Sequence, residues 1–199
     1  MVVRICLFFI VFFTVRAWAH PHDYVMLSVE PVVNEGREIV ALKERWLFTP
    51  FSAQSILEPV LKLSGYEAQK QAFAEVSDEM QTRLQGQNFY TFPEDLFADA
   101  VEDFALEVDE RGDLWLSFTL KVEAPSQALV YQIYEPTYWV AMLYDEQQSH
   151  QWRNGCQMLI EQANPTEADF LQASMLDINA RGAENLGAVF ADTARLDCS

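Results

Sequence analysis

Residues 24–48, YVMLSVEPVVNEGREIVALKERWLF, hold the pattern that decides the fold. Tyr24–Val33 is rich in valine and alternates imperfectly between apolar and polar residues, which is typical of a strand. Asn34–Gly36 is a turn signal, and Glu38–Phe48 is placed to return as the partner strand. We therefore expect the chain to form a β-hairpin here.

The next segment, from about residue 52 to 86, changes to a helical period. Ser52 is a candidate cap for a helix through Leu63, which Pro59 predicts to be short, bent or to begin near that proline. Tyr66–Gln85 places its apolar residues on one helical face, and Gly86 is well placed to end that helix. The residues of this face are Phe73, Val76, Met80 and Leu84. The sequence thus predicts a helical insertion.

Strand patterns return after the insertion. Asp103–Val108 and Leu114–Val122 flank a turn-like stretch, and Leu114, Leu116, Phe118 and Leu120 should share a core-facing side. Further strands are expected at Leu129–Tyr134, Tyr138–Tyr144 and Cys156–Glu161, and helices at Glu167–Leu176, capped by Thr166, and Ala183–Phe190. The predicted fold class is α+β, an antiparallel β-sheet or β-sandwich with an inserted helical segment and short C-terminal helices.

The aromatic stretch Tyr131–Tyr144 has two interpretations, a binding surface or core filling. Within it, Glu135 and Pro136 are expected to shape the connection between two strands.

The N-terminus resembles a cleavable secretion signal. Arg4 precedes the apolar run Ile5–Val15, which is shorter than the about 20 residues of a membrane span, and Ala17-Trp18-Ala19 has the small-x-small pattern of a cleavage site. We expect residues 1–19 to be the signal peptide and residues 20–199 a single periplasmic domain, since about 180 residues suit one domain.

Cleavage after Ala19 would make His20 the first residue and gather metal-ligand groups at the new terminus. The predicted ligands are the His20 amine and imidazole and the His22 imidazole, with Asp23, His150 or another acid completing the shell. Pro21 has no amide proton, which excludes the planar amino-terminal copper site that uses two deprotonated amides. Nitrogen-rich sets of this kind suit Zn, Ni or Cu. The alternative is that these histidines are solvated and idle, with His150 in an exposed loop.

Charge and cysteine usage narrow the class of protein. The formal net charge is −17, so an interaction with nucleic acid, which needs clustered Lys and Arg, is not expected. Once the signal is removed, Cys156 and Cys198 are the remaining cysteines, and an isolated pair in an oxidising compartment usually bonds. We expect a disulfide that closes a loop of roughly 40 residues and holds the C-terminus.

Several segments together resemble a bacterial periplasmic family of unknown function, domain of unknown function 1007. The matching segments, in order, are His20-Pro21-His22, residues 46–52 (WLFTPFS), residues 134–141 (YEPTYWVA), Gly155-Cys156 and Cys198. Members are described as periplasmic components of uncharacterised transport systems, and their genes accompany nickel/cobalt-type permeases or zinc-responsive genes. The resemblance implies a divalent transition metal and an inner-membrane metal permease as partners.

One segment departs from the family pattern. Many relatives carry an Asp-rich, calcium-loop-like stretch in the helical insertion, whereas Leu61–Ala68 has a single acid. A calcium loop needs several oxygen ligands at alternating positions, so no calcium site is expected here.

The sequence contains none of the common catalytic motifs, such as Gly-x-Ser-x-Gly or His-Glu-x-x-His, so an enzyme is not expected. The leading hypothesis is a periplasmic divalent-metal-binding or metal-delivery accessory protein. The alternatives are a metal-free interaction module of the cell envelope and, ranked last, an oxidative copper enzyme with a brace formed by His20 and His150.

Overall fold

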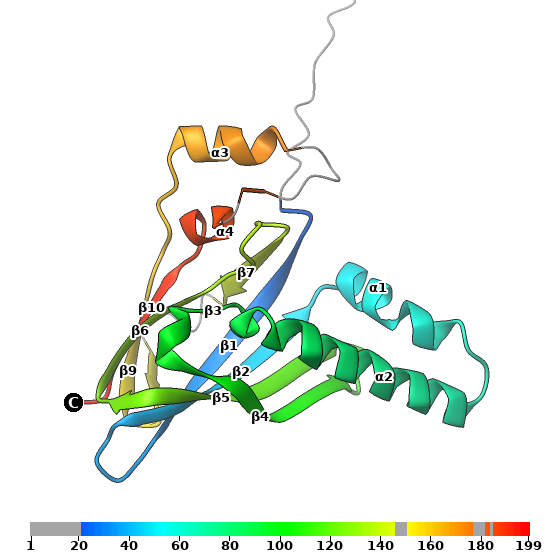
Figure 1. The fold of residues 1–199 in the computed structure, drawn as a ribbon, viewed down its shortest axis with the longest axis horizontal. Coiled ribbons are helices and arrows are strands. Elements are labelled where there is room, and N and C mark those ends of the chain that lie inside the picture. The colour runs from blue at the N-terminus through cyan, green and yellow to red at the C-terminus, as the bar shows by residue number, and fades with distance from the viewer. Residues whose placement is uncertain (1–20, 146–150, 177–181, 184) are drawn as a thin grey trace, which may run out of the picture.

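A computed structural model describes residues 21–145, 151–176, 182–183 and 185–199, with the side chains of residues 151–153 outside that description. It contains two five-stranded sheets, a long helical hairpin and short C-terminal helices (Figure 1). The elements are β1 Asp23–Val33, β2 Ile39–Phe48, α1 Pro50–Leu61, α2 Tyr66–Gln85, η1 Asn88–Tyr90, β3 Thr91–Phe92, η2 Glu94–Leu96, β4 Phe97–Val108, β5 Leu114–Ser126, β6 Ala128–Ile133, β7 Val140–Tyr144, β8 Gln151–Arg153, β9 Cys156–Glu161, α3 Glu167–Ser174, α4 Leu186–Val189 and β10 Thr193–Asp197. The predicted α+β class is confirmed.

The first sheet is built on the predicted hairpin. Its strand order is β4-β5-β2-β1-β7, and β1 pairs antiparallel with β2 so that Leu27 lies opposite Trp46. The second sheet has the order β3-β6-β10-β9-β8. Alternation sends every second side chain of β5 inward, and the predicted core residues Leu114, Leu116, Phe118 and Leu120 are all buried.

One hydrophobic core lies between the two sheets and the helices. It joins β1, β2 and β5 of the first sheet to β6, β9 and β10 of the second. From the helical hairpin, Ala53 and Leu84 enter this core, and the other residues of the predicted apolar face of α2 pack against it. Burial of this shared apolar surface is what holds the two sheets and the hairpin together.

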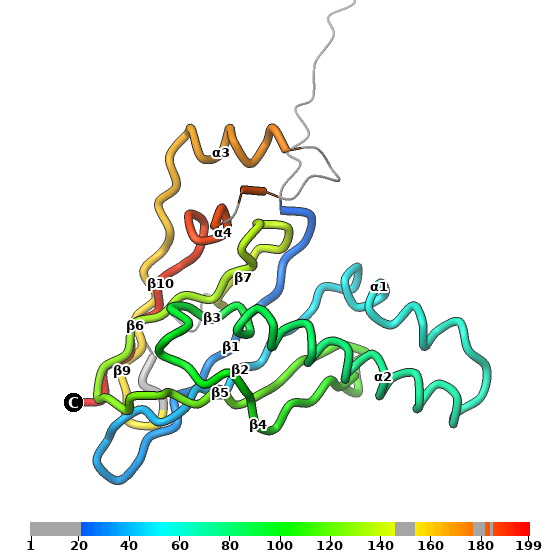
Figure 2. Tube along the Cα trace, viewed as in Figure 1, coloured from blue at the N-terminus to red at the C-terminus, as the bar shows by residue number. Residues whose placement is uncertain are grey.

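The two strands on either side of residues 135–137 lie in different sheets, which differs from the sequence prediction. Leu129–Tyr134 and Tyr138–Tyr144 were expected to be consecutive strands joined across residues 135–137, but β6 lies in the second sheet and β7 in the first. β7 begins at Val140 and runs parallel to β1, so the first sheet is not purely antiparallel. Tyr138 lies outside the strand because it has a φ of 59°, in the left-handed region. Figure 2 traces this connection between the sheets.

The helical insertion forms as predicted, with a different start. α1 begins at Pro50, and its cap is Thr49, whose hydroxyl accepts a hydrogen bond from the Ser52 amide, rather than Ser52 itself. A proline suits the first helical turn because its missing N–H has no partner there in any helix. α2 spans the predicted residues, Tyr66–Gln85, and Gly86 is its C-cap, as expected. Over the part of the chain that the structure describes, none of the helices is long and apolar enough to cross a membrane.

The C-terminal region closes the second sheet. Thr166 caps α3 in a capping box with Asp169, as the sequence predicts in part, although the helix ends at Ser174. The sequence prediction missed β10, which inserts between β6 and β9. The predicted disulfide is confirmed, and it joins Cys156 at the start of β9 to Cys198 just after β10. The C-terminus is therefore fixed to the sheet by hydrogen bonds and by a covalent bond.

The disulfide should contribute substantially to stability. Its two cysteines are 42 residues apart, and closing a loop of that length removes unfolded-state entropy worth about 4 kcal/mol. Replacing both Cys156 and Cys198 by Ala should lower the free energy of unfolding by an amount of that order, measured by urea unfolding monitored by circular dichroism.

Reductant is the control for this measurement. It should destabilise the parent protein and have no effect on the double alanine variant. A parent protein whose unfolding midpoint does not change on reduction would contradict the stabilising role.

Candidate functional site

The predicted metal ligands are only partly covered by the structure. The predicted signal segment 1–19, His20 and His150 lie outside the described residues. His22 and Asp23 are described, and they stand next to each other where β1 begins. Among the residues that the structure describes, no three His, Cys, Asp or Glu side chains lie together as a metal-holding group.

His22 is held against the segment that leads into β7. Its backbone N–H donates to the Trp139 carbonyl at 3.0 Å, which continues the parallel pairing of β1 with β7 by one residue. Its ring lies on the indole of Trp139, with ring centroids 4.1 Å apart. The side chain that sequence analysis selected as a ligand is therefore ordered by an aromatic contact.

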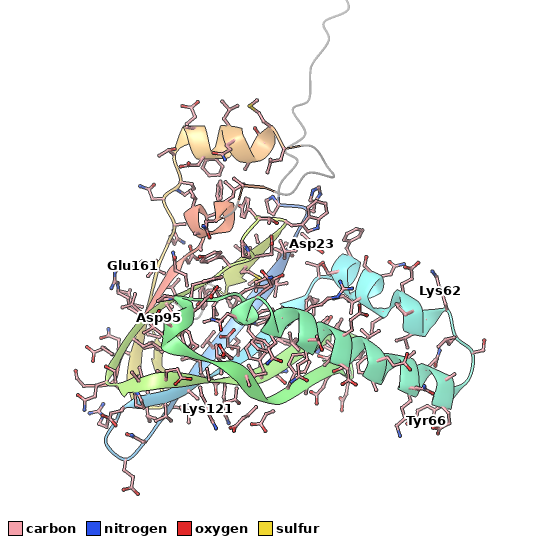
Figure 3. The ribbon with its side chains drawn as sticks, viewed as in Figure 1. Asp23, Lys62, Tyr66, Asp95, Lys121 and Glu161 are labelled. Atoms are coloured by element: carbon pink, nitrogen blue, oxygen red, sulfur yellow. A yellow bond between two sulfur atoms is a disulfide. The ribbon has the colours of Figure 1, made fainter. Side chains whose placement is uncertain are left out.

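Asp23 joins the start of β1 to the start of α1. One carboxylate oxygen accepts hydrogen bonds from the hydroxyls of Thr49, at 2.6 Å, and Ser52, at 2.5 Å, and the other accepts from the Tyr24 amide. Partial burial acts to raise the pKa of Asp23, but the hydrogen bonds from Ser52, Thr49 and Tyr24 together hold it below its usual value. Figure 3 shows Asp23 on the side of the molecule where α1 begins.

A cleft of about 640 Å³ lies beside this N-terminal segment. Its walls come from the inner face of the first sheet, the C-terminal half of α2, η1 and the connection into β7. Aromatic and aliphatic side chains form most of the lining, with a few polar groups among them. The apolar residues are Val25, Trp46, Phe48, Met80, Leu84, Tyr90, Pro136, Trp139, Val140 and Met142, and the polar ones are Arg83, Gln87, Glu135 and Thr137. Such a lining and volume are typical of a site for a small organic ligand.

Two segments far apart in the sequence meet in this cleft. Residues 46–48 come from the end of β2, and residues 135–140 come from the connection between the sheets. Both belong to the segments WLFTPFS and YEPTYWVA that sequence analysis singled out. Trp139 takes part in both regions, because its ring lines the cleft and also contacts His22.

The carboxylate of Glu135 shapes the connection between β6 and β7, as predicted from the sequence. Its oxygens accept hydrogen bonds from the Thr137 amide at 3.1 Å, from the Thr137 hydroxyl at 2.9 Å and from the Trp139 amide at 2.6 Å. These bonds fold residues 135–139 into a tight turn and fix where Trp139 enters the cleft.

The outer side of the same turn is covered by the C-terminal helices. The ring of Tyr138 stacks on Phe190 with centroids 4.1 Å apart, and the Gly187 amide donates to the Pro136 carbonyl. A Cβ at Gly187 would lie 2.0 Å from the Glu135 carbonyl oxygen, so glycine is required at this approach. The Tyr138–Phe190 stack and the Gly187–Pro136 hydrogen bond therefore hold the turn in position.

A buried acid, Glu44, is hydrogen-bonded to Trp46, which lines the cleft. It occupies an inward-facing position of β2 and is fully buried, with one oxygen accepting from the Trp46 indole N–H at 2.9 Å. The other oxygen lies 3.1 Å from the Thr91 hydroxyl, which is also 3.1 Å from the Phe89 carbonyl. One hydroxyl proton cannot serve both acceptors, so a proton on Glu44 completes the set. Burial raises the pKa of Glu44 to about 7, against the lowering effect of these hydrogen bonds.

A strained turn at residues 88–90 supplies one wall of the cleft. Asn88, Phe89 and Tyr90 all have left-handed φ values, of 48°, 49° and 57°. Each such residue costs on the order of 1 kcal/mol or more, so the surrounding structure must hold the turn in place. The fully buried Phe89 ring and the Glu44–Thr91 hydrogen bonds do so, and they bring Tyr90 into the cleft.

Sequence analysis missed several of these residues. Glu44 carries a detectable signal, because it is a charged residue at a core-facing position between Leu42 and Trp46. For Arg83 and Met80 the sequence carries no signal of a cleft. A helical pattern shows which face of the helix is apolar, but it does not show which other segments lie next to that face. Of the aromatic stretch, Tyr131 and Tyr144 fill the core, whereas Trp139 lines the cleft.

Comparisons with known proteins identify relatives without assigning a function. A family model described as "Protein of unknown function (DUF1007)" matches residues 5–198. An "Uncharacterized protein" of Haemophilus influenzae is 22% identical over 195 residues, covering 90% of this chain and 91% of that protein. No solved structure matches the chain.

The buried acid should make stability depend on pH in a defined direction. The Glu44 carboxyl is ionised above pH 4.5 in the unfolded chain but only above about 7 in the folded protein. Its stabilising contribution is therefore complete below the lower value and is lost as pH rises through the upper one. Glu44→Gln does not titrate, and its amide can accept from Trp46 while donating to Thr91. Relative to the parent, this variant should gain up to about 3 kcal/mol between pH 4.5 and 8, measured by urea unfolding.

Glu123→Gln is the matched control, because Glu123 is exposed on β5. Its free energy of unfolding should follow that of the parent at every pH. A Glu44→Gln variant that does so too would show that the folded carboxyl titrates at its ordinary value.

Proposed function

The chain belongs to this family of proteins of unknown function, and from that premise we propose that it is an exported, non-enzymatic accessory protein that binds a divalent transition metal. The metal is Zn, Ni or Cu, bound by the N-terminal segment that cleavage after Ala19 exposes, and the protein delivers it to an inner-membrane metal permease. The confirmed disulfide between Cys156 and Cys198 is compatible with export to the oxidising periplasm.

The single observation that carries this proposal is the anchoring of His22. Its backbone is bonded to Trp139 and its ring lies against the Trp139 indole. A ligand whose position is set before the metal arrives loses less conformational freedom on binding. His20 precedes His22 by two residues in the sequence, which favours chelation by a short N-terminal segment.

The proposal divides the predicted ligands into two roles. The His20 amine and imidazole and the His22 imidazole bind the metal, since nitrogen ligands suit these ions. Both oxygens of Asp23 already accept hydrogen bonds, so Asp23 holds the segment in position. His150 keeps its predicted role as a further ligand from a distant part of the chain.

The metal-free interaction module is the second candidate, and the cleft favours it. A volume of about 640 Å³ lined by aromatic rings and methionines is suited to an organic ligand or to side chains of a partner protein. This candidate needs no ligand from the N-terminal segment.

Metal titration of correctly processed protein separates the two candidates. Isothermal titration with Zn, Ni and Cu should show tight binding by the parent, and His20→Ala with His22→Ala should abolish it. Loss of an imidazole should weaken binding by more than about tenfold, because even outer-shell partners are worth that much. Affinity should fall as pH drops from about 7.5 to about 5.5, since imidazoles bind metals only when neutral.

A protein that retains Met1 or an N-terminal tag is the control, because it lacks the free His20 amine. It should bind more weakly than protein whose first residue is His20 by mass spectrometry. Equal binding by the double alanine variant and the parent would exclude the N-terminal site and favour the interaction module.

A further inference from the structure

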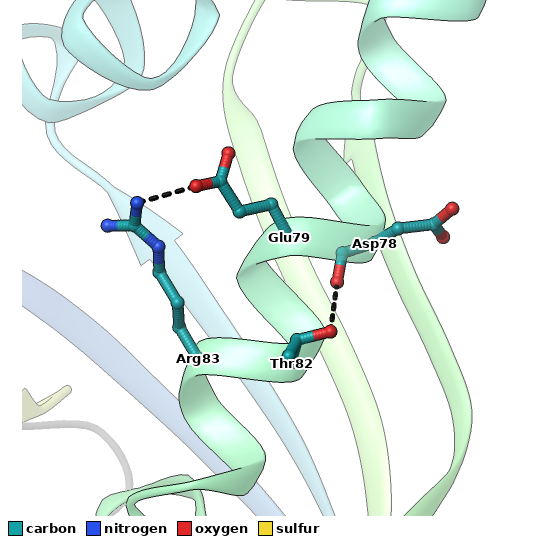
Figure 4. A network of polar contacts seen from close by, with 4 residues as sticks. All are labelled: Asp78, Glu79, Thr82 and Arg83. Atoms are coloured by element: carbon teal, nitrogen blue, oxygen red, sulfur yellow. Dashed lines mark hydrogen bonds and ion pairs between the residues drawn. The ribbon is translucent and has the colours of Figure 1, made fainter.

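The cleft between α2 and the connection into β7 has a definite electrostatic character. Two charged residues line it, Arg83 and Glu135. Arg83 is paired with Glu79 one turn earlier on α2, with 2.5 Å between guanidinium nitrogen and carboxylate oxygen (Figure 4). The pair carries no net charge, which leaves the Glu135 carboxylate as the net charge at the cleft.

The Glu135 carboxylate is hydrogen-bonded to uncharged groups. Its partners are the amides of Thr137 and Trp139 and the Thr137 hydroxyl, which are neutral dipoles. Such donors stabilise a carboxylate without cancelling its field. The protein as a whole carries a formal charge of −17, which adds to the attraction of a cation near the cleft.

Two further features of the cleft favour positive charge. α2 ends at Gln85, so the negative end of its helix dipole points to the region of Leu84 and Gln87, which line the cleft. Tyr90 and Trp139, both half-buried, contribute aromatic rings to the wall, and the Tyr90 ring lies parallel to that of Trp46. The faces of such rings attract cations, most strongly when water is excluded.

The remaining lining requires an apolar body on the ligand. Val25, Phe48, Met80, Val140 and Met142 present hydrocarbon and thioether surface. Methionine side chains adapt to ligands of different shape. A hydrated metal ion would gain nothing from this surface, whereas an organic amine would bury its hydrocarbon there.

We propose that this cleft binds an organic cation with an apolar body, an amine or quaternary ammonium compound, with the charge near Glu135 and the ring of Trp139. This site differs in its chemistry from the N-terminal metal site, and the two share one residue, Trp139. The strained turn at residues 88–90 serves it by holding Tyr90 in the wall.

Three probes with one phenylpropyl body test the charge preference. They are 3-phenylpropylammonium, 3-phenylpropan-1-ol and 3-phenylpropanoate, titrated into folded, disulfide-bonded protein with EDTA present to remove metal ions. Binding is followed by NMR at the indole N–H resonances of Trp46 and Trp139. The ammonium should bind about fivefold more tightly than the alcohol, and the carboxylate most weakly.

The effect of Arg83→Gln on ammonium affinity distinguishes a cation site from an anion site, because the two predict changes in opposite directions. Removing the guanidinium leaves Glu79 unpaired beside the cleft, so the ammonium should bind about twofold or more tightly. Lys62→Gln is the matched control, because Lys62 makes the same kind of exposed pair with Glu58, one turn earlier in α1. Figure 3 shows Lys62 near the far end of the helical hairpin. Its replacement should leave the affinity unchanged.

Met80→Lys tests the location of the site. It places a cation within the cleft and should weaken binding of the ammonium by more than about tenfold. Met175→Lys is its control, since Met175 is exposed just after α3 and does not line the cleft. Urea unfolding confirms that both variants are folded.

Three results would each overturn the proposal. They are no shift of either indole resonance with any probe, equal or tighter binding of the carboxylate than of the ammonium, and weaker ammonium binding by Arg83→Gln. Should Met80→Lys fail to fold, the Arg83 and Lys62 comparison decides alone, because both are surface positions. The N-terminal metal site is tested separately, by the metal titration of the parent and of the variant with His20→Ala and His22→Ala.

Discussion

The hydrogen bonds of one buried carboxyl group, that of Glu44, underlie the arrangement of the cleft. No cation of the described residues takes part in the hydrogen bonds of this side chain. Its partners are Trp46 and Thr91, which stabilise it in the core. Through Trp46 it orients an aromatic wall, and through Thr91 it supports the left-handed turn that presents Tyr90. A buried carboxyl avoids the cost of desolvating a charge by remaining protonated. A polar group at a core position thus positions the rings that a ligand would meet.

A second constraint is the passage of the chain from one sheet to the other between β6 and β7. The turn at residues 135–139 is held from inside by the Glu135 carboxylate and from outside by α4, where Gly187 permits close approach. The Tyr134 amide donates to the Tyr90 carbonyl, which ties this turn to the strained one. The two walls of the cleft are therefore connected directly by a backbone hydrogen bond.

The site was visible in the sequence only in part. The segments that hold Trp46 and Trp139 stood out as patterns, but neither pattern indicates that the two meet. His22 and Asp23 stood out as ligand types. The hydroxyls that donate to Asp23 belong to Thr49 and Ser52, which are not part of any ligand pattern. A pattern identifies chemistry residue by residue, whereas a site is a set of distances, and distances between remote segments follow from packing.

The sequence by itself determined the elements whose cause is local. Alternation in residues 24–48 specifies the hairpin, and the helical period and Gly86 specify α2. The disulfide was predicted from the number of cysteines that remain outside the predicted signal segment. Only the tertiary structure decided that β7 pairs in parallel with β1 and that β10 enters the second sheet. The reason is physical. The period of a strand depends on its own residues, but its partner is the neighbour whose pairing buries the most apolar surface and leaves the fewest backbone groups unbonded, and that depends on the whole chain.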